Sequence, residues 1–468
     1  MSTTLITGGR VITATRDTVE DILIEDGKVA RLGDLGDFPA DRVMDASGKL
    51  VIPGGIDPHT HMDTPAGDTF ISDDFYTGTV AAAVGGTTTI IDFPIQEKGD
   101  DPRVSLEDWF GKSEGKAAID WAFHQIIADL PPAYLPSLGA LIDEGVSSFK
   151  LFMAYPNAWM LDDGAIFSAL QWTSDNGGLI MLHCENGPAI EVLIQQAIAA
   201  GHTEPRFHAA TRPSIAEGEA TSRAIALAEI ARVPVYVVHM SAAEALSAVG
   251  QARGRGLPVY AETCPQYLLL SEDKLASPGF QGAKYVCSPP LRDPSHHDRM
   301  WEGLASGDLQ VVSTDHAPFH YKDQKEMGRG DFTKIPNGMP GVEWRVSLLY
   351  NFGVRENRIS LNRWVEITST NAAKLFGIYP QKGEIAPGSD GDLVIFDPDR
   401  PQTLSAETQM TNCDYNPYEG RVLQGAIRVV VLRGRVIVRD GRYAAPDPAG
   451  IFVRSAESAA LSSSTLVS

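Results

Sequence analysis

Two histidines one residue apart, His59 and His61, are the first residues of this chain that could bind a metal ion. They follow the apolar run Leu50-Val51-Ile52, which predicts that they lie at the carboxyl end of a buried strand. On an extended backbone their side chains point to the same side. Because imidazole nitrogen is a common zinc ligand, the pair would supply half of a zinc-type site.

Further residues able to bind a metal stand at the ends of other apolar runs. Residues 179–182 are followed by His183, residues 235–238 by His239, and residues 311–314 by Asp315. Each has an ordinary alternative, because a histidine that ends a strand is often a satisfied core residue and Asp315 could cap a helix. Since every one of them falls at a strand end, the set as a whole favours a shared metal site. We interpret the adjacent pair His296-His297 as a solvated surface feature.

Lys150 lies inside the apolar run Phe149-Lys150-Leu151-Phe152-Met153. A buried ammonium is costly unless it is paired or neutralised. One alternative is a snorkelling or ion-paired lysine. The other is an amine kept neutral, which captures carbon dioxide as a carbamate whose two oxygens bridge two metal ions.

The elements that must position these residues form an alternating pattern in the middle of the chain. Short apolar runs alternate with helical patterns such as Ala189 to Ala200 and Glu217 to Ala231. The eight strand candidates are residues 50–56, 87–93, 119–127, 146–153, 179–184, 233–240, 257–263 and 309–314. This α/β pattern predicts a (β/α)8 TIM-like barrel, whose chemistry takes place at the carboxyl ends of the strands.

The two ends of the chain are rich in strand patterns. Asp26-Gly27 near the start and Asp440-Gly441 near the end are typical of hairpin turns between β-rich runs. We therefore expect a small β-sandwich domain built from both chain ends. The expected domains are residues 1–53 plus 383–450 for the sandwich, 54–382 for the barrel, and 451–468 for a C-terminal arm or tail.

Composition limits the partners and the compartment. The net charge of −21 argues against nucleic acid and against an anionic membrane surface. The four cysteines are scattered, which suggests a reducing compartment. The N-terminal residues lack the charged and apolar regions of a signal peptide, and no apolar run is long enough to span a bilayer. We expect a cytoplasmic protein with no nucleic acid and no membrane partner.

These segments together resemble the dihydropyrimidinase and hydantoinase family of cyclic amidohydrolases. The matching segments cover nearly the whole chain and are residues 53–61, 85–88, 148–155, 183–186, 238–241, 288–292, 313–319, 335–338, 374–377, 388–393 and 414–416. The resemblance implies two zinc ions per subunit, bridged by carboxylated Lys150 and a hydroxide. It assigns His59, His61, Lys150 and Asp315 to the more buried zinc, and Lys150, His183 and His239 to the second.

The resemblance also implies how a substrate is held and opened. Tyr155 would donate a hydrogen bond to the carbonyl oxygen of the scissile amide, and the main chain at Ser288 and Asn337 would grip the amide groups of the ring. The shared hydroxide would attack the carbonyl carbon, while Asp315 passes its proton to the leaving nitrogen. The expected reaction opens dihydropyrimidines and 5-substituted hydantoins to N-carbamoyl amino acids. A homotetramer and a preference for D-enantiomers are further expectations from the family.

Two predicted loops bear on the choice of substrate. Phe70 and Ile71 follow the first strand, and Phe152 and Trp159, with Leu151, Met160 and Leu161, follow the fourth. They could wall a pocket for the ring substituent or could be ordinary loop packing. Neither loop contains an arginine, so uncharged rings are expected to be preferred over acidic ones. The alternatives are an allantoinase, imidase or dihydroorotase, a mononuclear deaminase, which would not need Lys150, and a metal-free scaffold relative.

Overall fold

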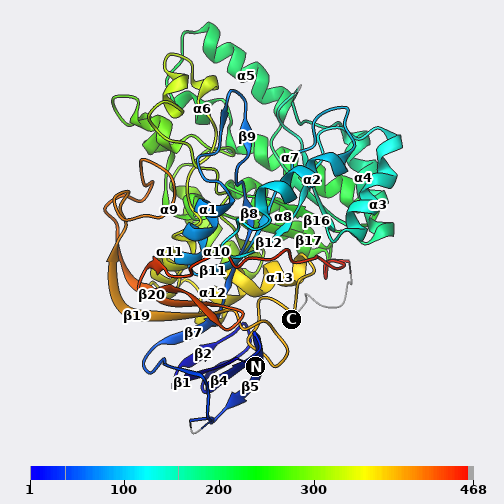
Figure 1. The fold of residues 1–468 in the computed structure, drawn as a ribbon. Helices are drawn as coiled ribbons and strands as arrows, with labels where there is room; N and C mark the ends of the chain where they lie inside the picture. Colours follow the sequence, from blue (N-terminus) through cyan, green and yellow to red (C-terminus); the bar gives the residue numbers. More distant parts are fainter. Residues whose placement is uncertain (1, 37, 157, 462–468) are drawn as a thin grey trace.

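Parallel strands in chain order form the centre of the molecule (Figure 1). The computed structural model describes residues 2–36, 38–156 and 158–461. The central strands are β8 (Gly55–Thr60), β11 (Thr87–Asp92), β12 (Asp120–Phe123) with β13 (Gln125–Ile126), β14 (Ser148–Phe152), β15 (Leu179–His183), β16 (Val235–Val237), β17 (Val259–Thr263) and β18 (Val311–Val312). A parallel bridge between Thr60 and His316 joins the last position to the first. Within the described residues, eight strand positions thus close into the predicted barrel.

Side chains along these strands point alternately into the barrel and outward to the surrounding helices. In the β14–β15 ladder, Lys150 pairs with Met181 and Phe152 with His183. Phe149 and Leu151 face the other way, into the large core beneath the helices. Because side chains on a strand point to alternate faces, this register directs Lys150 into the barrel.

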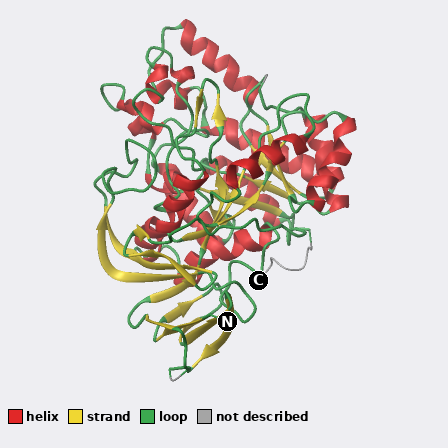
Figure 2. Ribbon diagram, viewed as in Figure 1, coloured by secondary structure: helices red, strands yellow, loops and turns green. Residues whose placement is uncertain are grey.

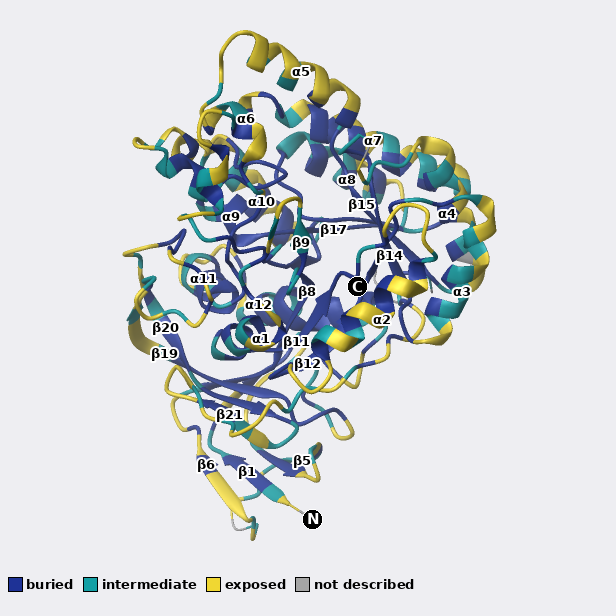
Figure 3. Ribbon diagram, turned by 45° about the horizontal axis from the view of Figure 1, so that its top comes forward, coloured by how far each residue is buried: buried dark blue, intermediate teal, exposed yellow. Residues whose placement is uncertain are grey.

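Helices surround the strands on the outside (Figure 2), and the strands between them are buried (Figure 3). The helices are α1 (Phe75–Val84), α2 (Pro102–Ser113), α3 (Leu135–Asp143), α4 (Asp163–Asn176), α5 (Gly187–Ala199), α6 (Arg206–Ala210), α7 (Ser214–Ala231), α8 (Ala243–Gly254), α9 (Pro265–Leu269), α10 (Ser295–Ser306), α11 (Arg345–Leu349), α12 (Leu361–Val365) and α13 (Asn371–Leu375). Among the described residues, none of these helices combines the length and the apolar character needed to cross a bilayer.

Two antiparallel-rich sheets pack below the barrel in Figure 1 and contain strands from both chain ends. One sheet has the order β5 (Lys28–Gly33), β4 (Asp21–Glu25), β1 (Thr3–Thr7), β6 (Arg42–Asp45). The other has the order β22 (Arg442–Tyr443), β21 (Arg435–Arg439), β20 (Val422–Leu432), β19 (Leu393–Thr403), β7 (Leu50–Pro53), β2 (Arg10–Ile12), β3 (Asp17–Val19). A shared core that includes Ile24, Val51 and Ile395 joins them into the predicted sandwich.

The prediction that residues 50–56 form the first barrel strand was wrong about where that strand begins. Residues 50–53 form β7, which pairs with β2 and β19 in the sandwich, and the barrel strand begins only at Gly55. At the junction, a Cβ on Gly54 would lie 2.0 Å from the Thr88 hydroxyl oxygen, so only glycine fits there. An apolar run has no feature that distinguishes a sandwich strand from a barrel strand. His59 consequently lies within β8 rather than after it.

The predicted C-terminal arm runs along the barrel as far as the structure describes it. Val453 donates its N–H to Trp121, Ser455 donates to Gly145, and the Phe452 ring lies 4.8 Å from that of Phe110. The arm up to residue 461 is therefore packed on its own chain, and residues 462–468 of the prediction lie outside the described residues.

Candidate metal centre and substrate cavity

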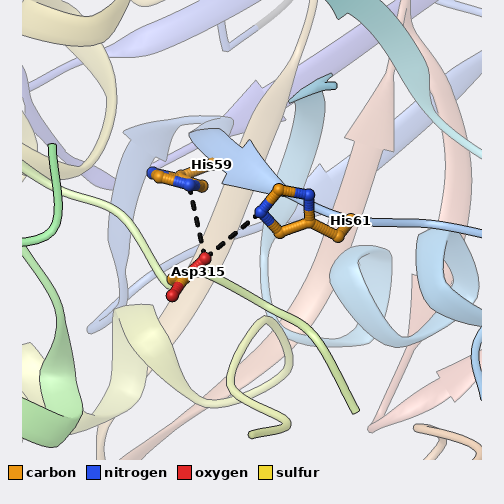
Figure 4. A group of neighbouring side chains, drawn as sticks. All are labelled: His59, His61 and Asp315. Carbon is orange, nitrogen blue, oxygen red and sulfur yellow. Dashed lines mark ion pairs between the residues drawn. The ribbon is translucent and has the colours of Figure 1, made fainter. Parts of the chain in front are cut away.

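The carboxyl ends of β8 and β18 bring together the first three predicted ligands (Figure 4). Oδ1 of Asp315 lies 3.3 Å from Nε2 of His59 and 3.3 Å from Nε2 of His61. One ligand atom from each residue lies within 4.8 Å of the other two. Burial opposes ionisation of Asp315, but the adjacent His59 and His61 together hold the pKa of its carboxyl below the usual range. Three convergent donors, one of them anionic, fit a metal cation.

Lys150 enters the same site from β14. Its side chain is buried, and its Nζ lies 2.8 Å from His59 Nε2. Burial lowers the pKa of the Lys150 ammonium, against the opposing charges of Asp315 and Glu262. A neutral amine is the form that adds carbon dioxide, so the environment suits the predicted carbamate.

The remaining two predicted ligands face each other at the ends of β15 and β16. Nδ1 of His183 lies 3.0 Å from Nε2 of His239. Nε2 of His183 is engaged by Glu185 at 2.9 Å, which leaves Nδ1 as the nitrogen that faces the site. The other nitrogen of His239, Nδ1, is buried without a hydrogen-bond partner among the described residues. His183 Nδ1 and His239 Nε2 thus face each other, and this arrangement suits a second metal ion bound between them.

Sequence reasoning missed the carboxylates that orient these rings. Glu262 on β17 lies 2.6 Å from Nδ1 of His59 and accepts a hydrogen bond from the Tyr236 hydroxyl at 2.9 Å. Glu185 binds His183 and is paired with Arg212 at 3.0 Å. The sequence feature that could have revealed Glu262 is a charged residue inside the apolar run Val259–Thr263. Such outer carboxylates fix the tautomer of a metal-binding histidine.

Strained backbone marks three of the site residues. Tyr155, His239 and Asp315 have φ angles of 64°, 38° and 51°. Residues other than glycine adopt this left-handed region at a cost of about 1–3 kcal/mol, and such strained residues tend to cluster at functional sites. Here the strain coincides with the residues predicted to bind metal and substrate.

A cavity of about 680 Å³ opens over these residues. Its walls include every residue predicted to contact substrate: Phe152, Tyr155, Trp159, Ser288 and Asn337. Of the predicted ligands, it exposes His61, Lys150, His183, His239 and Asp315, whereas His59 is fully buried beneath them. The Phe152 and Trp159 rings lie 5.3 Å apart, which makes an apolar wall on one side. Of the other loop residues that could have walled a pocket, Ile71 lines the cavity, whereas Leu151 belongs to the outer core and Phe70, Met160 and Leu161 are not among the lining residues.

Two of the residues that line this cavity keep their main-chain hydrogen-bonding groups free. Neither the N–H nor the C=O of Ser288 or Asn337 has a partner within the described residues. Tyr155 supplies a third polar group, and burial raises the pKa of its hydroxyl to about 12, so it stays a donor at neutral pH. A cavity with apolar walls and a few convergent polar groups is typical of a small-molecule site.

Two other groups of polar side chains lie outside this site: a cluster of three aspartates and the His296-His297 pair. Asp120, Asp390 and Asp392 converge below the barrel, but Lys382 is ion-paired with all three. Arg433 also pairs with Asp120 and Lys28 with Asp390, so three cations already balance the three carboxylates. The His296-His297 pair is half-buried rather than solvated, because Ala243 donates its N–H to His296 and the His297 ring contacts the Leu270 carbonyl at 2.9 Å.

A sequence profile of the Amidohydrolase family matches residues 50–437. The chain belongs to the amidohydrolase family. It is 54% identical to a D-hydantoinase of Streptomyces coelicolor over 94% of this chain and 96% of that protein. It is 48% identical to a D-hydantoinase of Geobacillus stearothermophilus over 98% of both chains. The crystal structure of a dihydropyrimidinase from Brevibacillus agri superposes with a TM-score of 0.96, at 47% identity, over 97% of this chain and 99% of that one.

These similarities confirm three of the predictions. The resemblance to the dihydropyrimidinase and hydantoinase family is correct, the barrel is that of an amidohydrolase, and the chain is a hydrolase rather than a metal-free scaffold. Membership of the amidohydrolase family also implies a metal cofactor, and the ligand atoms of His59, His61 and Asp315 lie close enough together to hold one.

Proposed function

We propose that this amidohydrolase opens the cyclic amide bond of dihydropyrimidines and 5-substituted hydantoins to give N-carbamoyl amino acids. The observation that carries the proposal is the convergence of metal-binding side chains, a buried tyrosine donor and unpartnered main-chain amides around one cavity. The names of the relatives, D-hydantoinase and dihydropyrimidinase, support it.

The proposed cofactor is a pair of zinc ions. His59, His61, Asp315 and carboxylated Lys150 would hold one ion, and Lys150, His183 and His239 the other. When bound, such a pair supplies an activated water and a positive charge for the amide oxygen. In the net reaction the water oxygen bonds to the ring carbonyl carbon, the ring C–N bond breaks, and the nitrogen takes up a proton.

The chain itself would supply hydrogen bonds and a proton carrier. Tyr155 would donate its O–H to the amide oxygen as negative charge develops there, because it remains protonated at neutral pH. Asp315 is ionised and lies beside the cavity, so its carboxylate can take the proton of the attacking water and return it to the leaving nitrogen. The free main-chain groups of Ser288 and Asn337 would orient the ring.

The walls of the cavity favour an uncharged substrate. Among the described residues that line it, the basic side chains other than histidine are Lys150, within the metal site, and Lys334, which is exposed and lies near Asp331. None of these lining residues is an arginine that could pair with a carboxylate on the substrate ring. The Phe152 and Trp159 side chains would instead pack against the ring substituent.

The test combines metal analysis of the purified protein with hydrolysis assays. We expect close to two metal ions per chain, turnover of dihydrouracil and of a 5-substituted hydantoin, and little turnover of dihydroorotate. Equal turnover of dihydroorotate would disprove the preference for neutral rings. Absence of metal and of turnover, even after zinc and bicarbonate are supplied, would disprove the proposed function. The homotetramer stays a prediction, which light scattering after size-exclusion chromatography can check.

A further inference from the structure

Lys325 is a buried ammonium outside the metal centre. It begins the short 3-10 helix Lys325–Gly328, and its side chain is fully buried. Among the described residues, no carboxylate lies within ion-pairing distance of it. Its Nζ instead donates three hydrogen bonds, to the carbonyl oxygens of Val286 at 2.9 Å, Pro336 at 2.6 Å and Gly338 at 2.7 Å. The three N–H groups of the ammonium are therefore all satisfied by main chain.

The three carbonyls belong to two separate segments, and each segment carries a cavity residue. Val286 lies two residues before Ser288, and Pro336 and Gly338 flank Asn337. The Val286 carbonyl also accepts the N–H of Gly338 at 3.0 Å, so the segments are in direct contact. The carbonyls of Pro336 and Gly338 both point toward the Lys325 Nζ. Because Lys325 binds the carbonyls on both sides of Asn337, the peptide groups of Asn337 remain free for the cavity.

Beyond the three carbonyls, no charged group among the described neighbours of Lys325 stabilises a positive charge. Burial lowers the pKa of Lys325 to about 7, whereas three carbonyl acceptors favour its charged form. Among the described residues, the titratable groups that face it are the thiols of Cys287 and Cys413 and the imidazole of His208, all of which burial keeps neutral. The Phe319 ring lies 5.5 Å away. An apolar residue would cost less here if the site required only packing.

We propose that Lys325 is a positioning residue that ties the segment ending at Ser288 to the segment around Asn337. By holding Val286, Pro336 and Gly338 at one nitrogen atom, it fixes the spacing at which the free main-chain groups of Ser288 and Asn337 meet the two sides of a cyclic amide. The proposal rests on the proposed function for the nature of the ring, but the tie between the segments is a property of this chain alone.

The test compares Lys325→Met, which removes every donor, with Lys325→Gln, which keeps two N–H groups. Lys322→Met, on an exposed lysine three residues earlier, is the matched control. The first readout is hydrogen–deuterium exchange, followed by mass spectrometry, in peptides that cover 286–288 and 336–338. We expect faster exchange in both peptides of Lys325→Met, a smaller rise in Lys325→Gln, and unchanged exchange in β15 and β16.

The second readout is steady-state kinetics with metal content measured alongside. For Lys325→Met we expect KM for a cyclic amide to rise about 10- to 100-fold, with kcat changed less and metal content unchanged, because the buried carbonyls lose their common donor. Unchanged exchange at both segments would overturn the proposal. So would global unfolding or metal loss in both Lys325 variants, because Lys325 would then be a general stabiliser. If the unmodified protein opens no ring, the proposed function fails while the exchange data still decide whether the tie exists.

Discussion

Lys150 Nζ lies 2.8 Å from His59 Nε2, the same nitrogen that lies 3.3 Å from Asp315. Because Glu262 engages Nδ1 of His59, Nε2 is the acceptor that faces both the lysine and the metal position. The lone pair of this nitrogen cannot accept a hydrogen bond from Lys150 and bind a metal ion at the same time. Conversion of the amine to a carbamate, as proposed, would remove this competition and would add two oxygen ligands for the metal ions.

Lys150→Ala should abolish both metal binding and turnover, since it removes the only predicted ligand shared by the two metal positions. Elemental analysis and an assay with dihydrouracil check this. Lys98→Ala, on an exposed lysine, should retain both properties. Full activity in Lys150→Ala would rule out the carbamate.

Reconstitution of the metal-free protein should depend on bicarbonate. After treatment with a chelator we expect no turnover, because the ligands remain but the cation is gone. Zinc alone in buffer freed of carbon dioxide should restore activity slowly or in part, and zinc with bicarbonate should restore it fully. Equal rates and extents of recovery under the two conditions would indicate that Lys150 binds no carbon dioxide.

Tyr155→Phe should lower kcat by about 10²- to 10³-fold, because one donor to the developing oxyanion is lost. Metal content should not change, since Tyr155 is not among the predicted ligands. Steady-state kinetics with a 5-substituted hydantoin measure the effect. Tyr76→Phe, on a half-exposed ring of α1, is the control that should behave as the unmodified protein. A loss of metal in Tyr155→Phe would assign the residue to the metal centre instead.

Acid should destabilise the protein partly through His208. Burial lowers the pKa of His208 from 6.5 to about 3, so between these values the unfolded chain binds a proton that the native chain does not. The free energy of unfolding therefore falls as the pH drops below 6.5. Between pH 7 and 4.5 this one group contributes a loss of about 2–3 kcal/mol.

His208→Gln should show a smaller loss over the same interval, although it can be less stable at pH 7. Glutamine cannot take up the proton, yet it retains an N–H donor for the Cys287 carbonyl, which His208 contacts at 2.9 Å. Urea titrations at the two pH values measure the difference. His202→Gln, on an exposed histidine, should keep the pH dependence of the unmodified protein. An unchanged pH dependence in His208→Gln would mean that His208 is already charged in the native state.

The predicted ligands could be found in the sequence because strands impose a local order on it. An apolar run that ends in His183 or His239 has a definite direction, and parallel strands in a barrel end at one face. Lys150 was identifiable because a lysine in a buried run violates a local rule. The alternating pattern of the middle of the chain likewise indicated the barrel, and hairpin signals at both ends indicated the sandwich.

Only the tertiary structure decided which residues support those ligands and where the elements divide. Glu262 is 203 positions from His59, and Lys325 binds carbonyls of residues 286 and 336, so no local pattern connects them. Residues 50–56 were predicted as one strand, yet the first four of them pair with β19 from the far end of the chain and with β2 near its start. Local sequence determines the type of an element and the chemistry at its end, because those depend on neighbours in the chain. Partners across the fold depend on packing, which brings distant residues together.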